Sequence, residues 1–66
     1  MKIRINGKES EYTGRPVLGE LLRSFGIDPE QVAVEHNRGI VARKAIESLS
    51  VQAGDELEII RFVGGG

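Results

Sequence analysis

The sequence has no cysteine and only one histidine, His36, among its 66 residues. The absence of cysteine excludes disulfide bonds, which stabilise many small domains. A closed zinc site is also excluded, because one imidazole without any thiolate cannot supply the usual four ligands. The stability of this chain must therefore come from regular packing.

Long apolar runs and clusters of like charge are missing as well. No apolar stretch approaches the roughly 20 residues of a membrane-spanning helix, and the first residues have the pattern of a strand rather than of a signal peptide. Nine basic and ten acidic side chains are mixed along the chain, whereas a nucleic-acid-binding surface needs basic residues gathered on one face. We expect a cytoplasmic protein that binds neither a membrane nor nucleic acid.

The composition is that of one small globular domain. The chain is 39% hydrophobic and 29% charged, with a formal net charge of −1, which is unlike the composition of a disordered chain. A domain of this size buries only about 60% of its unfolded surface, which leaves little room for an interior active site. We expect residues 1–63 to form the domain and residues 64–66, which are all glycine, to form a flexible tail.

Apolar and polar residues alternate, or short apolar runs occur, in five segments that predict β-strands: residues 1–5, 8–12, 32–35, 40–42 and 56–63. Asn6-Gly7 favours a type I′ turn, because both residues tolerate a positive φ. The returning strand is polar and is expected at a sheet edge. Residues 43–50 predict one short helical turn packed on the core.

One helix is predicted between the second and third strands. Pro16 suits the first helical position, where its missing N–H costs nothing, and either Thr13 or Arg15 lies near the cap. Gly26 and Ile27 predict a Schellman motif at the end of the helix. Five apolar residues at helical spacing form the predicted buried stripe: Val17, Leu18, Leu21, Leu22 and Phe25.

This order of elements predicts a two-layer α+β fold with one main helix on a mixed four- to five-stranded sheet. A helical crossover after a hairpin most easily returns the chain parallel to an earlier strand. The last strand is the most apolar, and we expect it in the centre of the sheet beside the first strand. That topology is the β-grasp, or ubiquitin-like, fold.

The last strand changes its pattern before it ends. Leu57 and Ile59 are expected to face the helix, whereas Ile60 and Phe62 fall on the opposite, solvent-exposed face. A late twist or bulge could return these two side chains to the core, but an exposed patch for a partner protein is the interpretation that we favour. The predicted docking residues are consecutive: Ile60, Arg61, Phe62 and Val63.

The glycines that follow the strand have two interpretations. They form a linker or a fraying end, or they carry the terminal carboxylate through a narrow cleft, since glycine has no Cβ to contact the walls. A carboxylate is a poor electrophile. Activation by a nucleotide converts it to an acyl-adenylate, which an external sulfur or amine nucleophile can attack.

The Arg-Phe-Val-Gly-Gly-Gly ending at residues 61–66 resembles that of the ThiS sulfur-carrier family of thiamin biosynthesis, as do residues 32–37 and 53–56. The resemblance covers essentially the whole chain. It implies that an E1-like adenylyltransferase, using ATP and magnesium, adenylates Gly66. A sulfur-donating enzyme then supplies the sulfur of a thiocarboxylate, which thiazole synthase uses. The resemblance also implies that Gly64 and Gly65 thread into the partner sites, and that the carrier itself binds no cofactor.

Two other functions fit the sequence. One is a sulfur carrier for molybdopterin synthesis or tRNA thiolation, and the other is a ubiquitin-like binding module whose tail has no role. His36 is expected to be a surface residue without an orienting carboxylate, and Arg61 either pairs with an acidic partner groove or is solvated. Four acidic residues are expected on solvated strand faces: Glu9, Glu11, Glu56 and Glu58. Because no residue set supports catalysis or metal binding, we expect a protein substrate rather than an enzyme.

Overall fold

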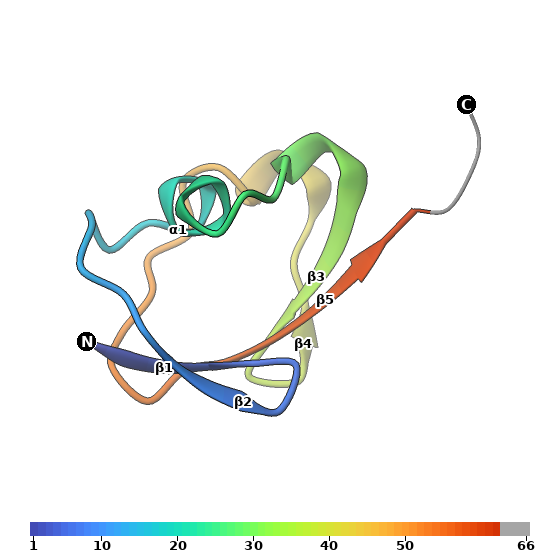
Figure 1. Ribbon diagram of the computed structural model, residues 1–66. Helices are drawn as coiled ribbons and strands as arrows, with labels where there is room; N and C mark the ends of the chain where they lie inside the picture. The colour runs from blue at the N-terminus through green and yellow to red at the C-terminus, as the bar shows by residue number, and fades with distance from the viewer. Residues whose placement is uncertain (63–66) are drawn as a thin grey trace.

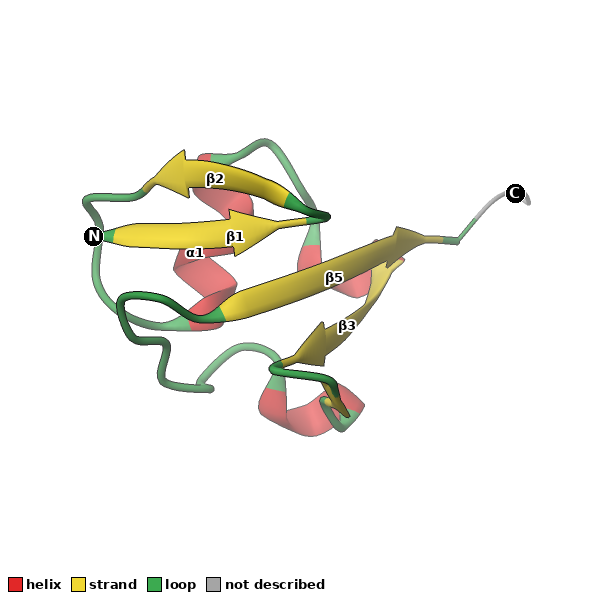
Figure 2. Ribbon diagram, turned by 90° about the horizontal axis from the view of Figure 1, so that it is seen from below, coloured by secondary structure: helices red, strands yellow, loops and turns green. Residues whose placement is uncertain are grey.

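The computed structural model describes residues 1–62 and confirms the predicted two-layer fold (Figure 1). The five strands are β1 (Lys2–Ile5), β2 (Lys8–Glu11), β3 (Val32–His36), β4 (Gly39–Ile40) and β5 (Glu56–Arg61). The main helix is α1 (Leu18–Ser24), and two 3-10 turns, η1 (Pro29–Gln31) and η2 (Arg43–Ala45), lie before β3 and after β4. Figure 2 views the sheet from the side opposite α1.

The strand order is β2-β1-β5-β3-β4, so β5 lies in the centre as predicted. It is parallel to β1 and antiparallel to β3, and its pairing with β3 extends from His36 opposite Leu57 to Val32 opposite Arg61. This mixed sheet covered by one helix is the β-grasp arrangement. The last strand is paired on both sides where it begins, at Glu56 and Leu57, whereas Ile60 and Arg61 at its end pair with β3.

The first hairpin has the predicted turn and a polar edge strand. Asn6 and Gly7 have φ values of 50° and 81°, as a type I′ turn requires. Tyr12, directly after β2, is buried, and its hydroxyl donates a 2.6 Å hydrogen bond to the Arg15 carbonyl. A Cβ on Gly14 would lie only 2.3 Å from the Tyr12 hydroxyl oxygen. Glycine at this position therefore lets the tyrosine ring close one end of the core.

The helix begins later than predicted. Pro16 does not start α1, and neither Thr13 nor Arg15 caps it, because the N-cap residue is Val17. Val17 is extended, with φ −128° and ψ 143°, and it forms an isolated antiparallel bridge with Ser50. This contact between distant segments keeps Val17 out of the helix.

Main-chain carbonyls replace the missing side-chain cap at the start of α1. The Leu18 N–H donates to the Leu49 carbonyl at 2.8 Å, and the Gly19 N–H donates to the Glu47 carbonyl at 3.2 Å. A Cβ on Gly19 would lie 2.8 Å from that Glu47 oxygen. Glycine therefore allows the close approach through which the 47–49 segment satisfies the free N–H groups of the helix.

The end of α1 confirms the predicted Schellman motif. Gly26 has a φ of 76°. Its N–H donates to the Arg23 carbonyl, and the Ile27 N–H donates to the Leu22 carbonyl, both at 2.9 Å. These are the two hydrogen bonds that define the motif.

The core lies between α1 and the sheet. Among residues 1–62, eleven hydrophobic side chains are buried: Ile3, Tyr12, Leu18, Leu21, Leu22, Val32, Val34, Ile46, Val51, Leu57 and Ile59. Three of the five residues in the predicted helical stripe are among them. Val17 is half-buried, and Phe25 is exposed, contrary to the prediction, because it is the C-cap residue, where the helix has already ended.

The segment after β3 differs slightly from the prediction. β4 contains Gly39 and Ile40 alone, so it is shorter than the predicted strand over residues 40–42. The predicted helical turn follows as η2, and Ile46 behind it is buried. No helix within residues 1–62 is long and apolar enough to cross a membrane.

Candidate functional site

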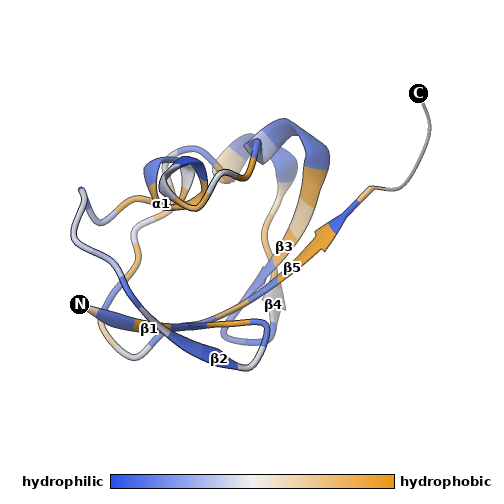
Figure 3. Cartoon of the chain, viewed as in Figure 1, coloured by the Kyte–Doolittle hydropathy of each residue, from blue (hydrophilic) through white to orange (hydrophobic). Residues whose placement is uncertain are grey.

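The exit of β5 separates buried from exposed side chains as the sequence predicts. Leu57 and Ile59 are buried under α1, whereas Ile60 and Phe62 are 57% and 61% exposed. Figure 3 shows that hydrophobic residues continue to this end of the sheet. The alternative of a bulge that returns Ile60 and Phe62 to the core is therefore wrong.

Ile60 belongs to an apolar surface on the open face of the sheet, which we define as Ala33, Ile40 and Ile60. Ala33 lies opposite Ile60 in the β3–β5 ladder, and the three residues line one shallow hollow together with Val34 and Glu35. Ile40 is 85% exposed. Ile40 was not among the predicted docking residues, because the face on which it lies follows from the pairing of β3 with both β4 and β5.

Acidic side chains border the apolar surface. Glu35 on β3 lies directly opposite Glu58 on β5, and neither carboxylate has an ion-pair partner within residues 1–62. Like charges directly opposite each other destabilise a sheet. Arg4 and Arg38 line the adjoining hollow with Glu56 and these two acids. The open face thus combines exposed isoleucines with a neighbouring group of three carboxylates and two arginines.

Asn6 attaches the first turn to β5. Its side-chain Oδ1 accepts a hydrogen bond from the Ile59 N–H at 2.7 Å, and its Nδ2 donates to the Ile59 carbonyl at 3.2 Å. The Asn6 N–H also donates to the Leu57 carbonyl at 2.8 Å. One side chain thereby continues the β1–β5 ladder beyond the end of β1. The Asn6-Gly7 pair predicts the turn, but no local pattern indicates the contact with Ile59.

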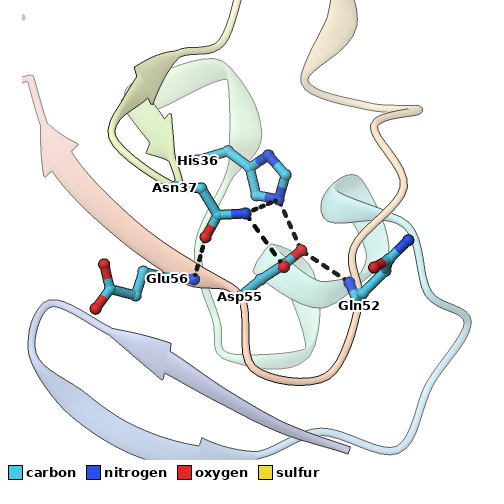
Figure 4. Close-up of polar contacts among 5 residues, drawn as sticks. All are labelled: His36, Asn37, Gln52, Asp55 and Glu56. Carbon is cyan, nitrogen blue, oxygen red and sulfur yellow. Dashed lines mark hydrogen bonds and ion pairs between the residues drawn. The ribbon is translucent and has the colours of Figure 1, made fainter.

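The prediction that His36 lacks an orienting carboxylate is wrong, because His36 contacts Asp55. Its Nε2 lies 2.7 Å from Asp55 Oδ2, and both side chains are largely buried (Figure 4). A carboxylate accepts hydrogen bonds, so Nε2 carries the proton. Asn37 Nδ2 donates to Asp55 Oδ1 at 3.2 Å, and Asn37 Oδ1 accepts from the Glu56 N–H at 2.9 Å. The cluster joins the end of β3 to the start of β5.

The environment of Asp55 changes its acidity. Partial burial raises the pKa of the Asp55 carboxyl, but hydrogen bonds from His36, the Gln52 N–H and Asn37 act against burial and prevail. The net pKa lies below its usual value. The three hydrogen bonds thus stabilise the ionised carboxylate of Asp55 relative to its protonated form.

We predict that Asp55→Asn destabilises the fold by about 1 to 3 kcal/mol at neutral pH, because it weakens several charge-assisted hydrogen bonds. The lowered pKa means that this stabilisation is complete above the unfolded-state value, near pH 4, and is lost as pH falls through the folded-state value. Urea unfolding measured at neutral and acidic pH should show the difference between wild type and variant shrinking below about pH 4. Glu9→Gln, on the exposed β2, is the control; a pH-independent difference for Asp55→Asn contradicts the prediction.

Phe62 lies apart from the apolar surface. It lines a second hollow with Arg61, Gln31 and residues 26–28 near the end of α1. Its N–H donates to the Gln31 carbonyl at 3.0 Å. The prediction that Ile60 and Phe62 share one patch is therefore wrong: Ile60 lies on the open face, whereas Arg61 and Phe62 lie beside η1.

The remaining predicted site residues, Val63, Gly64, Gly65 and Gly66, lie outside the described residues. Within residues 1–62, no group of three histidine, aspartate or glutamate side chains could hold a metal ion. Glu9, Glu11, Glu56 and Glu58 are exposed on their strands, as expected.

Comparison with known proteins gives matches over nearly the whole chain. The model of the ThiS family matches residues 3–66. The chain is 31% identical to the sulfur carrier protein ThiS of Bacillus subtilis, over 97% of this chain and 98% of that protein. It is also 41% identical, over its full length, to a thiazole synthase of Paramagnetospirillum magneticum, although it spans only 20% of that protein.

The fold is shared with a solved structure. The crystal structure of the thiamine biosynthesis protein ThiS from Geobacter metallireducens matches this chain with a TM-score of 0.81 and 35% sequence identity, and the match covers 100% of both chains. Sequence and structure agree: the chain belongs to the ThiS family.

Proposed function

We propose that this protein is a sulfur carrier of thiamin biosynthesis and that the carboxylate of Gly66 carries the sulfur. The observation that carries the proposal is the family match, which extends through residues 64–66. The central position of β5 supports it, because a strand that is paired with β3 as far as Arg61 can present the glycines that follow it to another protein.

The proposed chemistry begins with activation of the terminal carboxylate. A carboxylate oxygen of Gly66 attacks the α-phosphorus of ATP, and pyrophosphate leaves with its magnesium ion. Hydrosulfide delivered by a sulfur-donating enzyme then attacks the acyl carbon, so that a C–S bond forms and the C–O bond to AMP breaks. The thiocarboxylic acid that results loses its proton to water and becomes a thiocarboxylate. The carrier contributes the carboxylate and the recognition surface, while an E1-like adenylyltransferase binds the nucleotide and stabilises the charge that develops.

Thiazole synthase is the proposed acceptor of the sulfur. This chain matches a fifth of the length of thiazole synthases from Paramagnetospirillum magneticum and Magnetococcus marinus, at 41% and 38% identity. A ThiS-like segment within those chains supports a direct functional connection between carrier and synthase.

The apolar surface is the proposed docking site for the activating enzyme. Ile40 and Ile60 offer exposed hydrophobic area, and Glu35 and Glu58 favour a partner with basic side chains around an apolar centre. The basic side chains of such a partner would reduce the repulsion between the two carboxylates, and its apolar centre would bury the isoleucines. Both the electrostatic and the hydrophobic contribution would then favour binding.

Intact mass measurement tests the proposed function. After incubation with the activating enzyme, ATP and a sulfur donor, we expect the carrier to gain the mass difference between one sulfur and one oxygen atom. Fragmentation should locate the change at Gly66, and omission of ATP should prevent it. Sulfur attached at another residue would overturn the proposal. An unchanged mass after incubation with an activating enzyme from the same organism, shown to be active on another ThiS protein, would also overturn it.

A further inference from the structure

We propose that Arg43 is a positioning residue that holds Phe62 and thereby sets the direction in which the chain leaves β5. The inference rests on the proposed function, since the orientation of the exit matters when residues beyond Phe62 must enter a partner. Arg43 lies in η2, far from Phe62 in sequence, and no pattern in the sequence connects the two residues.

Arg43 contacts three separate parts of the fold. Its Nη1 donates to the Pro29 carbonyl at 2.6 Å, and its Nη2 donates to the Val32 carbonyl at 2.5 Å. Its Cζ lies 5.7 Å from the centroid of the Phe62 ring, within the range of a cation–π interaction. The guanidinium therefore connects η1, the first residue of β3 and the end of the last strand.

The edge of the sheet explains why arginine is suited to this position. β4 pairs only with Glu35 and His36, in the second half of β3. At the other end of β3, Arg43 supplies donors to the Val32 carbonyl and to the preceding turn. A planar guanidinium can donate to both carbonyls and still present a face to an aromatic ring, whereas the point charge of lysine cannot satisfy this geometry.

Two contacts hold Phe62 in place. Its main chain is attached to the Gln31 carbonyl, and its ring lies under the Arg43 guanidinium. We take the carrier to bind the activating enzyme only when Phe62 is held in this position. Release of the ring then lowers the fraction of carrier molecules that can bind, and the apparent affinity for the enzyme falls in the same proportion. The rate of chemistry after binding is unchanged by such a loss.

Kinetics of ATP–pyrophosphate exchange with the activating enzyme test this role. Arg43→Met retains the apolar stem but removes the charge and the donors, and we expect the KM for the carrier to rise about threefold to fivefold with kcat unchanged. Phe62→Leu should raise KM as well, and adding Arg43→Met to Phe62→Leu should raise it no further. Lys44→Met, which removes the neighbouring exposed charge, should leave KM unchanged.

A spectroscopic readout separates positioning from general loss of stability. In the free wild-type protein, the Arg43 side-chain protons should show a ring-current shift in NMR spectra that disappears in Phe62→Leu, a variant of an exposed residue. Absence of this shift, an effect on kcat alone, or additive effects in the double variant would overturn the role of Arg43. Failure of the wild-type chain to support any exchange would instead overturn the proposed function.

Discussion

Addition of one residue after Gly66 is expected to lower ATP–pyrophosphate exchange by at least about 100-fold, because displacement of a reacting group by even an ångström can cost that much. Deletion of Gly66 should have a similar effect, since the carboxylate of the shortened chain would stop short of the α-phosphorus. Neither change touches the core, which lies within residues 1–62. Exchange is measured with the activating enzyme at saturating ATP.

Replacement of the terminal carboxylate by a carboxamide is the matched control for this experiment. The amide has nearly the same size but lacks the anionic oxygen that attacks phosphorus, so it should bind the enzyme and fail to exchange. Binding without exchange would assign the loss to chemistry rather than to a steric clash. Exchange at the wild-type rate by the extended or shortened chain would contradict the proposed role of Gly66.

Ile60→Asp is expected to weaken binding to the activating enzyme by at least about tenfold, because a charge would replace apolar area in the centre of the docking surface. The new carboxylate would also join Glu35 and Glu58 on the same face of the sheet. Ile60 is 57% exposed, so we expect the fold to remain intact. Isothermal titration gives the affinity, and urea unfolding checks the stability.

Two control variants isolate the effect of the docking surface. Ile60→Val keeps a branched apolar side chain on β5 and should bind within about twofold of wild type. Thr13→Asp adds the same negative charge on an exposed loop outside the apolar surface and should bind normally. Ile40→Asp should reproduce the loss, because Ile40 lines the same hollow. Unchanged affinity of both aspartate variants at Ile40 and Ile60 would exclude this face as the docking site.

Much of the fold could be predicted because its signals are local. The helical spacing of Leu18, Leu21 and Leu22 identified the buried face of α1, and Gly26 identified its end. The alternation along β5 correctly separated buried Leu57 from exposed Ile60. Such patterns depend on the periods of helix and strand, which the sequence carries directly.

The errors occurred where distant segments compete with local preference. Pro16 is a good first helical residue by itself, yet the bridge between Val17 and Ser50 moved the start of α1 to Leu18. Phe25 continued the helical spacing, but the helix had ended before it. A short apolar run predicted β4 over three residues, whereas the ladder with β3 accommodates Gly39 and Ile40 alone.

The sequence by itself determined the order of elements, the side of β5 that is buried and the glycines that end the chain, because these features follow from residue type and spacing. Only the tertiary structure decided which side chains meet. His36 and Asp55 are 19 residues apart, and Ile40 meets Ile60 only through the register of β3 against β4 and β5. Strand register brings these residues together, and no local pattern specifies it, so the surface and supports of the terminal strand became visible only in the folded chain.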